Sequence, residues 1–170
     1  MISKKICMLG AFSVGKTSLV ERYVQSVFSD KYLSTVGVKI SKKEIVIDQK
    51  KMTLVLWDME GKDLYANINL SYLRGAMGFF VVADGTRKET LETALQIRSL
   101  AIDVLSPLPH CLLINKADRL PDWEITDDML RELSLKNITF LTTSAKTGQG
   151  VEEAFTFLAK AMMPEQGFAQ

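Results

Sequence analysis

The segment Gly10–Thr17 contains residue types that bind phosphate, at the spacing that phosphate binding requires. It matches G-x-x-x-x-G-K-[ST], directly after an apolar run and at the start of a helix-like one. Lys16 would bring a positive charge to the β- and γ-phosphates of a nucleotide, and Thr17 would offer a hydroxyl to Mg²⁺. Glycine allows backbone N–H groups to converge on phosphate oxygens at a helix N-terminus. The expected phosphate-binding residues are Ser13, Val14, Gly15, Lys16, Thr17 and Ser18.

A second candidate is Asp58-Met-Glu-Gly61, which follows a β-rich run ending at Trp57. A carboxylate at a strand end opposite a P-loop is placed to hold Mg²⁺, usually through its water. The backbone N–H of Gly61 would reach the γ-phosphate. D-x-x-G is a weak pattern alone, and it indicates a Mg²⁺ and phosphate site only because a P-loop precedes it.

Two further motifs indicate which base is bound. Asn115-Lys116-Ala-Asp118 follows an apolar run, and the two oxygens of Asp118 would accept from the N1–H and exocyclic amine that guanine presents side by side. The aliphatic stem of Lys116 can cover one face of the base. In Ser144-Ala145-Lys146, a backbone N–H would reach the guanine O6 and the lysine stem would also cover the base. The predicted ligands are therefore GTP or GDP with Mg²⁺.

Strand-like and helix-like segments alternate along the chain, and these elements must position the motifs. The expected strands are Ile6–Leu9, Lys39–Ile47, Met52–Trp57, Phe79–Ala83, Cys111–Ile114 and Ile138–Thr142, and the expected helices are Thr17–Val27, Glu89–Leu105, Asp127–Leu133 and Val151–Met162. This alternation predicts an α/β fold of the P-loop NTPase type, with a doubly wound, mostly parallel six-stranded sheet and helices on both faces. Ligands bind at the carboxyl ends of the strands in such sheets, which is where the motifs fall.

One antiparallel edge strand is expected, because the two β-rich segments are joined by a polar turn, Asp48–Lys51. Lys42 and Lys43 on that edge strand are interpreted as solvated charges that guard it against pairing with other chains.

The bulk composition favours one cytoplasmic domain over residues 1–170. Its length of 170 residues fits a single domain, and a net charge of +1 gives no positive excess for a nucleic-acid partner. Cys7 and Cys111 lie inside apolar runs and are interpreted as buried, reduced thiols. A secretory leader is not evident in the sequence, and its apolar runs are shorter than a membrane helix needs.

The four motifs, in this order and spacing, resemble those of the Ras superfamily of small GTPases, and most closely its Rab-like branch. The resemblance extends from about Lys5 to Met162. It implies that Thr35, in a segment similar to the family's first switch loop, contacts Mg²⁺ and the γ-phosphate. It also implies that Phe28 places its aromatic edge against the guanine and that Tyr32 closes over the phosphates. From the residues alone, the alternative for Phe28 is a core aromatic at the end of the first helix, and the alternative for Tyr32 is a solvated loop tyrosine.

The sequence departs from this family at the position on which hydrolysis depends. Where the family has a glutamine that orients the attacking water, this chain has Lys62, which has donors only. Glu60 precedes the glycine, and Phe12 is bulky where an activating partner's arginine would approach. Two interpretations stay open. Lys62 impairs hydrolysis and biases the switch towards its GTP form, or Lys62 itself stabilises charge in the transition state.

Three classes of function follow. The first is a molecular switch that cycles between GTP and GDP with slow hydrolysis, in which Lys16, Thr35, Gly61 and Lys62 are the catalytic candidates. The second is a GTP-binding interaction protein with little or no hydrolysis. The third, a P-loop kinase or ATPase, is disfavoured by Asp118. Expected partners are effector, exchange or activating proteins at the switch segments of a monomer. The last residues, Met162–Gln170, offer no cysteine for a lipid anchor.

Overall fold

Hydrophobic runs that alternate with polar turns form a mixed sheet of six strands in the computed structural model, which describes residues 2–31, 34–59, 61 and 70–164. The strand order is β2-β3-β1-β4-β5-β6. The strands are β1 (Ile2–Gly10), β2 (Val38–Ile47), β3 (Lys50–Met59), β4 (Gly78–Asp84), β5 (His110–Asn115) and β6 (Phe140–Thr142). Strand β1 is parallel to β3 and β4, β5 is parallel to β4 and β6, and only β2 is antiparallel to its neighbour. The predicted α/β fold with an antiparallel edge strand is confirmed.

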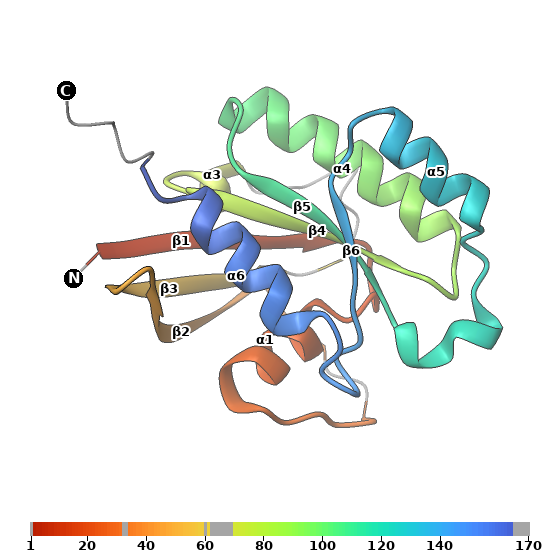
Figure 1. Ribbon diagram of the computed structural model, residues 1–170, viewed down its shortest axis with the longest axis horizontal. Coiled ribbons are helices and arrows are strands. Elements are labelled where there is room, and N and C mark those ends of the chain that lie inside the picture. The colour runs from red at the N-terminus through yellow and green to blue at the C-terminus, as the bar shows by residue number, and fades with distance from the viewer. Residues whose placement is uncertain (1, 32–33, 60, 62–69, 165–170) are drawn as a thin grey trace.

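Helices cover both faces of the sheet (Figure 1). They are α1 (Lys16–Gln25), α3 (Leu70–Leu73), α4 (Glu89–Leu105), the 3₁₀ helix η1 (Ala117–Asp122), α5 (Asp127–Leu135) and α6 (Val151–Ala161). Helices α1 and α6 pack on one face, and α4 and α5 pack on the other. None of the described helices is long and apolar enough to cross a membrane.

The alternation of side chains along each strand divides the interior into two cores. In β1, Ile6 and Met8 face α1 and α6, whereas Cys7 and Leu9 face α4. Both cysteines are buried free thiols, as predicted. Burial raises the pKa of the Cys7 thiol to about 11 and that of the Cys111 thiol to about 12. Because both faces of the parallel strands are buried, their sequences are continuously apolar, which made them recognisable.

The hairpin turn is tighter than the sequence indicated. The predicted turn covered Asp48–Lys51, but Ile47 pairs with Lys50, so only Asp48 and Gln49 connect the strands. Both have positive φ, 48° and 65°, as in a type I′ turn. Turns of this type usually contain glycine. Because Asp48 and Gln49 occupy the turn here, the sequence did not indicate that Ile47 pairs with Lys50.

The interpretation of Lys43 as a solvated charge is wrong, whereas Lys42 is exposed as expected. The Lys43 ammonium donates a 2.6 Å hydrogen bond to the carbonyl of Tyr23 and lies 3.7 Å from the centre of its ring. Tyr23 in turn stacks on Phe155, with ring centroids 3.8 Å apart. Lys43 therefore joins the edge strand to α1 and α6.

Most predicted elements are present with shifted ends, and α4 has the predicted bounds. Helix α1 ends at Gln25 rather than Val27, because Ser26 adopts a left-handed conformation and its N–H bonds the carbonyl of Arg22. Strand β6 begins at Phe140 rather than Ile138. The short helices α3 and η1 were not predicted, since each is too brief to show a period.

Candidate functional site

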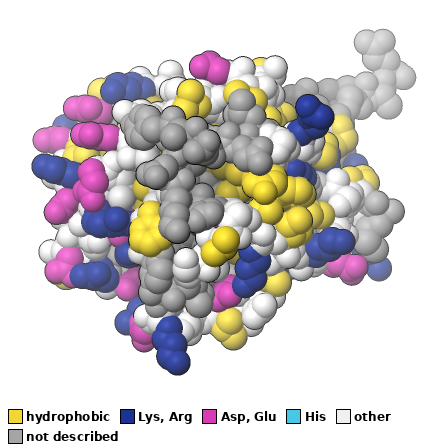
Figure 2. Space-filling model, turned by 180° about the vertical axis from the view of Figure 1, so that it is seen from behind, with side chains coloured by type: hydrophobic (Ala, Val, Ile, Leu, Met, Phe, Trp, Pro, Cys, Tyr) yellow, Lys and Arg dark blue, Asp and Glu magenta, His cyan; other side chains and the backbone are white. Residues whose placement is uncertain are grey.

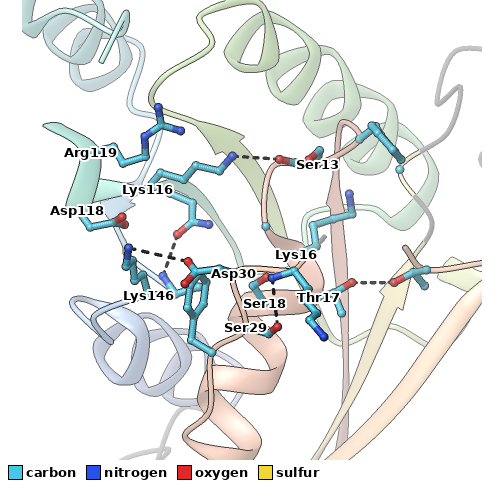
Figure 3. A pocket seen from close by; sticks show the side chains of 18 of the residues that line it. Ser13, Lys16, Thr17, Ser18, Ser29, Asp30, Lys116, Asp118, Arg119 and Lys146 are labelled. Carbon is cyan, nitrogen blue, oxygen red and sulfur yellow. Dashed lines mark hydrogen bonds and ion pairs between the residues drawn. The ribbon is translucent and has the colours of Figure 1, made fainter. Parts of the chain in front are cut away.

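The carboxyl ends of the strands meet at a cavity of ≈ 300 Å³ (Figure 3). Segments that are far apart in the sequence line it, from the loop after β1 to the loop after β6. The predicted site residues in its lining are Ser13, Gly15, Lys16, Thr17, Ser18, Phe28, Thr35, Gly61, Asn115, Lys116, Asp118, Ala145 and Lys146. Three others lie behind the lining: Val14, Asp58 and Ser144. Tyr32 and Lys62 fall outside the described residues, as does Glu60.

The loop between β1 and α1 takes a path that only glycine permits at Gly15. Its φ is +102°, and a Cβ built there would lie 2.3 Å from Nδ2 of Asn115. Helix α1 starts at the next residue, so its free N–H groups and its positive dipole end face the cavity. This is the arrangement that binds an anion.

Lys16 is held with its charge beneath this loop. Its ammonium donates to the carbonyls of Gly10 at 2.9 Å and Ala11 at 2.8 Å, and the side chain is buried. Burial lowers the pKa of Lys16 to about 8, and the nearby carboxylate of Asp58 partly offsets this effect. The group is thus still mainly protonated at pH 7 and is available to an anion in the cavity.

Thr17, Thr35 and Asp58 form a cluster of oxygen atoms beside Lys16. The two hydroxyls are 2.7 Å apart, and they donate to Oδ2 of Asp58 at 2.5 Å and 3.2 Å. Burial raises the pKa of Asp58, although the two hydroxyls and Lys16 oppose this. Its Oδ1 is buried and has no hydrogen-bond partner among the described residues. Hard oxygen donors around an unsatisfied carboxylate suit a divalent cation such as Mg²⁺.

Gly61 lies against the P-loop so closely that a side chain would not fit. A Cβ there would be 2.8 Å from both the Lys16 ammonium and Cα of Phe12. The backbone of Gly61 therefore approaches the end of the cavity that holds Lys16. This close approach is consistent with the predicted role of its N–H.

Asn115 at the end of β5 joins the two halves of the site. Its Nδ2 donates to the carbonyl of Val14 at 3.0 Å, and its Oδ1 accepts from Oγ1 of Thr143 at 3.2 Å and from the N–H of Ala145 at 3.3 Å. One buried amide thus fixes the P-loop relative to the loop that follows β6. Its role is structural support of the site, in addition to any contact with a ligand.

Lys116 and Asp118 extend from the same loop into the cavity. Lys116 has a left-handed backbone, φ 70°, and its ammonium donates to the carbonyl of Ser13 at 3.3 Å (Figure 3). Oδ1 of Asp118 accepts a 2.6 Å hydrogen bond from Oγ of Ser144. Ser144 is fully buried, so it orients Asp118 rather than lining the cavity.

The remaining predicted residues border the opposite side. Phe28 is half-buried and packs against the core as well as lining the cavity, so its core role is confirmed and its contact with the base stays a prediction. The Lys146 ammonium lies 3.9 Å from a carboxylate oxygen of Asp30. Asp30 and Arg119 line the cavity and were not predicted.

Three charged residues that support the loops of the site were also missed. Asp84 is fully buried, and its carboxylate lies 2.6 Å from the Lys116 ammonium. Burial opposes its ionisation, but hydrogen bonds from Lys116 and Thr86 hold its pKa below the usual range. The other two are Arg87 and Arg22. Asp84 could have been predicted, because it directly follows the predicted strand Phe79–Ala83 and ligands bind at the carboxyl ends of the strands in such sheets. The arginines carry no such signal.

A P-loop, a helix N-terminus and an oxygen cluster at the carboxyl edge of a parallel sheet define a P-loop nucleotide-binding protein of the α/β class. Comparison of the sequence with known proteins narrows this class. A sequence model of the Ras family matches residues 5–164. The chain therefore belongs to the Ras family, whose members are small GTP-binding switch proteins.

Rab proteins are among its relatives. The chain is 33% identical to the human Ras-related protein Rab-8B over 161 residues, which cover 94% of this chain and 78% of that protein. It is 31% identical to the bovine Ras-related protein Rab-13 over 165 residues, which cover 96% and 81%. The Rab-like character inferred from the motifs is thereby confirmed.

Proposed function

We propose that this protein binds GTP and GDP with Mg²⁺ in the cavity, acts as a molecular switch, and hydrolyses GTP slowly as a single-domain cytoplasmic monomer. The observation that carries the proposal is the convergence of Thr17, Thr35 and Asp58 next to Lys16, with Oδ1 of Asp58 left without a partner among the residues that the structure describes. Both features are suited to a metal–phosphate pair. The reduced, buried cysteines favour the cytoplasm.

In this proposal the phosphates bind at the start of α1. The N–H groups of the loop hold the phosphate oxygens, and Lys16 neutralises charge on the β- and γ-phosphates. Thr17 and Thr35 provide ligands to Mg²⁺, and Asp58 supports its water. When bound, the metal ion neutralises charge on the transferred phosphoryl group. Gly61 contributes an N–H towards the γ-phosphate, so its segment responds to the presence of that phosphate.

The base end of the cavity accounts for guanine specificity. Asp118, fixed by Ser144, accepts from the N1–H and the amine of guanine, whereas adenine lacks that amine. The stems of Lys116 and Lys146 cover the base, and the aromatic edge of Phe28 lies against it. A kinase or ATPase would need an adenine site here, and tighter binding of ADP than of GDP would favour that class.

The second candidate is a GTP-binding interaction protein with little or no hydrolysis, and Lys62 is the observation that favours it. Lysine cannot accept a hydrogen bond from an attacking water, as the usual glutamine does. Phe12 adds to this, because it lines the cavity and its side chain is 46% exposed at the rim. An arginine from an activating partner would meet this ring.

Single-turnover hydrolysis of preloaded Mg²⁺·GTP distinguishes the two candidates. The proteins compared are the wild type, Lys62→Gln and Lys136→Gln. Lys136→Gln is the matched control, because Lys136 is an exposed lysine at the end of α5. We expect the wild type at or below about 10⁻⁴ s⁻¹, the unassisted rate of Ras itself. A Lys62→Gln variant that hydrolyses faster shows that the lysine limits the reaction. Equal rates in all three proteins would show that it does not.

Partner proteins are expected at the β2–β3 hairpin and the segments beside it. Val36 is 83% exposed and Ile40 is 49% exposed, and both are apolar. Figure 2 shows hydrophobic side chains gathered on the side of the molecule opposite to that in Figure 1. Leu64 and Tyr65, which closely follow Lys62 and are also expected to contact partners, lie outside the described residues.

A further inference from the structure

Arg87, just after β4, binds the backbone of the P-loop. Its Nη2 donates a 3.0 Å hydrogen bond to the carbonyl of Phe12, and its Nε lies 3.1 Å from Oδ2 of Asp84. The same Asp84 carboxylate binds Lys116, which donates to the carbonyl of Ser13. Two consecutive P-loop carbonyls are thus each capped by a cation, and both cations are anchored on one buried carboxylate.

This arrangement determines which way the amides of the loop point. In a trans peptide the carbonyl and the following N–H point in opposite directions. Fixing the carbonyls of Phe12 and Ser13 on Arg87 and Lys116 therefore turns the N–H groups of Ser13 and Val14 away from these cations, towards the phosphate side of the loop.

Arg22 performs the equivalent task at the base end. From α1, its Nε donates a 2.7 Å hydrogen bond to the carbonyl of Ala145, and its Nη2 donates to the carbonyl of Lys146. The N–H of Thr147 belongs to the same peptide as the Lys146 carbonyl, and it donates to Oγ of Ser144 at 3.1 Å. That hydroxyl donates to Asp118. A continuous set of bonds thus connects Arg22 to the carboxylate that faces the base.

We propose that Arg87 and Arg22 are positioning residues for opposite ends of one nucleotide: Arg87 orients the phosphate-binding amides, and Arg22 orients the base-reading carboxylate. This inference rests on the proposed function, because both ends must serve the same ligand. The inference goes beyond the proposed function, because it assigns phosphate recognition and base recognition to two separate arginines that lie outside the four sequence motifs.

The test uses two affinity ratios measured by competition binding in the presence of Mg²⁺. The preference for GDP over GMP reports on recognition of the β-phosphate. The preference for GDP over IDP, which lacks the exocyclic amine, reports on Asp118. The proteins are the wild type, Arg87→Met, Arg22→Met, and Arg131→Met as a control, because Arg131 is an exposed arginine on α5 that pairs with Asp128.

Arg87→Met should lower the GDP-over-GMP preference about tenfold, the effect of losing one charge-assisted hydrogen bond, and leave the GDP-over-IDP preference unchanged. Arg22→Met should do the reverse, lowering GDP over IDP about fivefold to tenfold with GDP over GMP unchanged. Arg131→Met should alter neither ratio. Arg87→Lys and Arg22→Lys keep the charge but only one donor group, so each should show a smaller fall in its own ratio.

A general loss of stability would weaken all three nucleotides in proportion and leave both ratios constant, which would overturn the proposal. It would also be overturned if either variant lowered both ratios together. Should a methionine variant fail to fold, the lysine variant decides by the same ratios. A wild type with no preference for GDP over IDP would refute the proposed function itself, which is a separate outcome.

Discussion

The hydroxyl oxygens of Thr17 and Thr35 lie 2.7 Å apart, and both contact the same oxygen of Asp58. The three residues come from the start of α1, the segment before β2 and the end of β3. Their convergence means that both open ends of the β2–β3 hairpin lie at the side of the cavity that holds Lys16. Any change in the position of Thr35 therefore changes the hydrogen bonding of Asp58.

Replacement of Asp58 by asparagine should remove the magnesium-dependent part of nucleotide binding. A neutral amide cannot support a divalent cation as a carboxylate does. GDP should raise the unfolding temperature of the wild type more with Mg²⁺ than with a chelator, as ligand linkage requires. Asp58→Asn should show equal, small rises in both conditions. Asp103→Asn, an exposed acid on α4, is the control. A full magnesium effect in Asp58→Asn would contradict the assignment.

Replacement of Gly15 by alanine should damage the fold and the site together. The new Cβ would lie 2.3 Å from Asn115, which cannot yield because its amide is already bonded to Val14, Thr143 and Ala145. We expect a loss of about 2–3 kcal/mol in the free energy of unfolding. Urea denaturation measures it.

The matched control for this variant is Gly75→Ala. Gly75 also has a positive φ, +76°, but a Cβ there would meet no atom of the described residues within 4 Å. Its cost should be only the backbone strain, about 1 kcal/mol. Equal losses for the two variants would show that the contact with Asn115 is unimportant.

Lys43→Met should destabilise the protein by about 1–2 kcal/mol, although Lys43 is a lysine on an edge strand. It loses a charged hydrogen bond to the Tyr23 carbonyl and a contact with the Tyr23 ring. The ion pair with Glu152, 3.6 Å long and largely exposed, contributes little. Lys42→Met, next to it but exposed, should change the free energy by less than about 0.5 kcal/mol. Similar values for both in thermal or urea unfolding would argue against the Tyr23 contact.

The two cysteines should resist thiol reagents until the chain unfolds. Cys7 and Cys111 have no exposed surface, and burial raises their pKa values to about 11 and about 12. Reaction requires the thiolate, which is scarce in the folded protein at pH 8. Labelling at pH 8 should therefore follow the rate of unfolding as urea is added. Rapid labelling of either thiol in the native protein would contradict this.

The same shifts predict a pH dependence. Both folded pKa values lie above the ordinary value of 9.0, so the stability that these thiols contribute is fully present below pH 9. It is lost as the pH rises from about 9 through 11 and 12. Cys111→Val should flatten this fall in the free energy of unfolding above pH 9, and an unchanged slope would count against it.

The parts of this protein that could be predicted from its sequence are those with local signals. Buried parallel strands appear as unbroken apolar runs, and Asn115, Lys116 and Asp118 directly follow one of them, so their position at the cavity was predictable. Arg22 and Arg87 were not predictable, because their partners, Ala145 and Phe12, lie far away in the sequence. Thr35 was found only through the family resemblance.

The order of the site's segments along the chain has a consequence for how the protein is made. The P-loop, the hairpin and Gly61 all come from the first part of the chain, whereas the residues proposed to contact the base follow β5 and β6. During synthesis the ribosome therefore releases the P-loop side of the cavity first. A nascent chain that stops before Ser144–Lys146 lacks the hydroxyl that bonds Asp118 and the carbonyl that Arg22 holds. The lining of the cavity is completed only when the loop after β6, the last strand of the sheet, has been made.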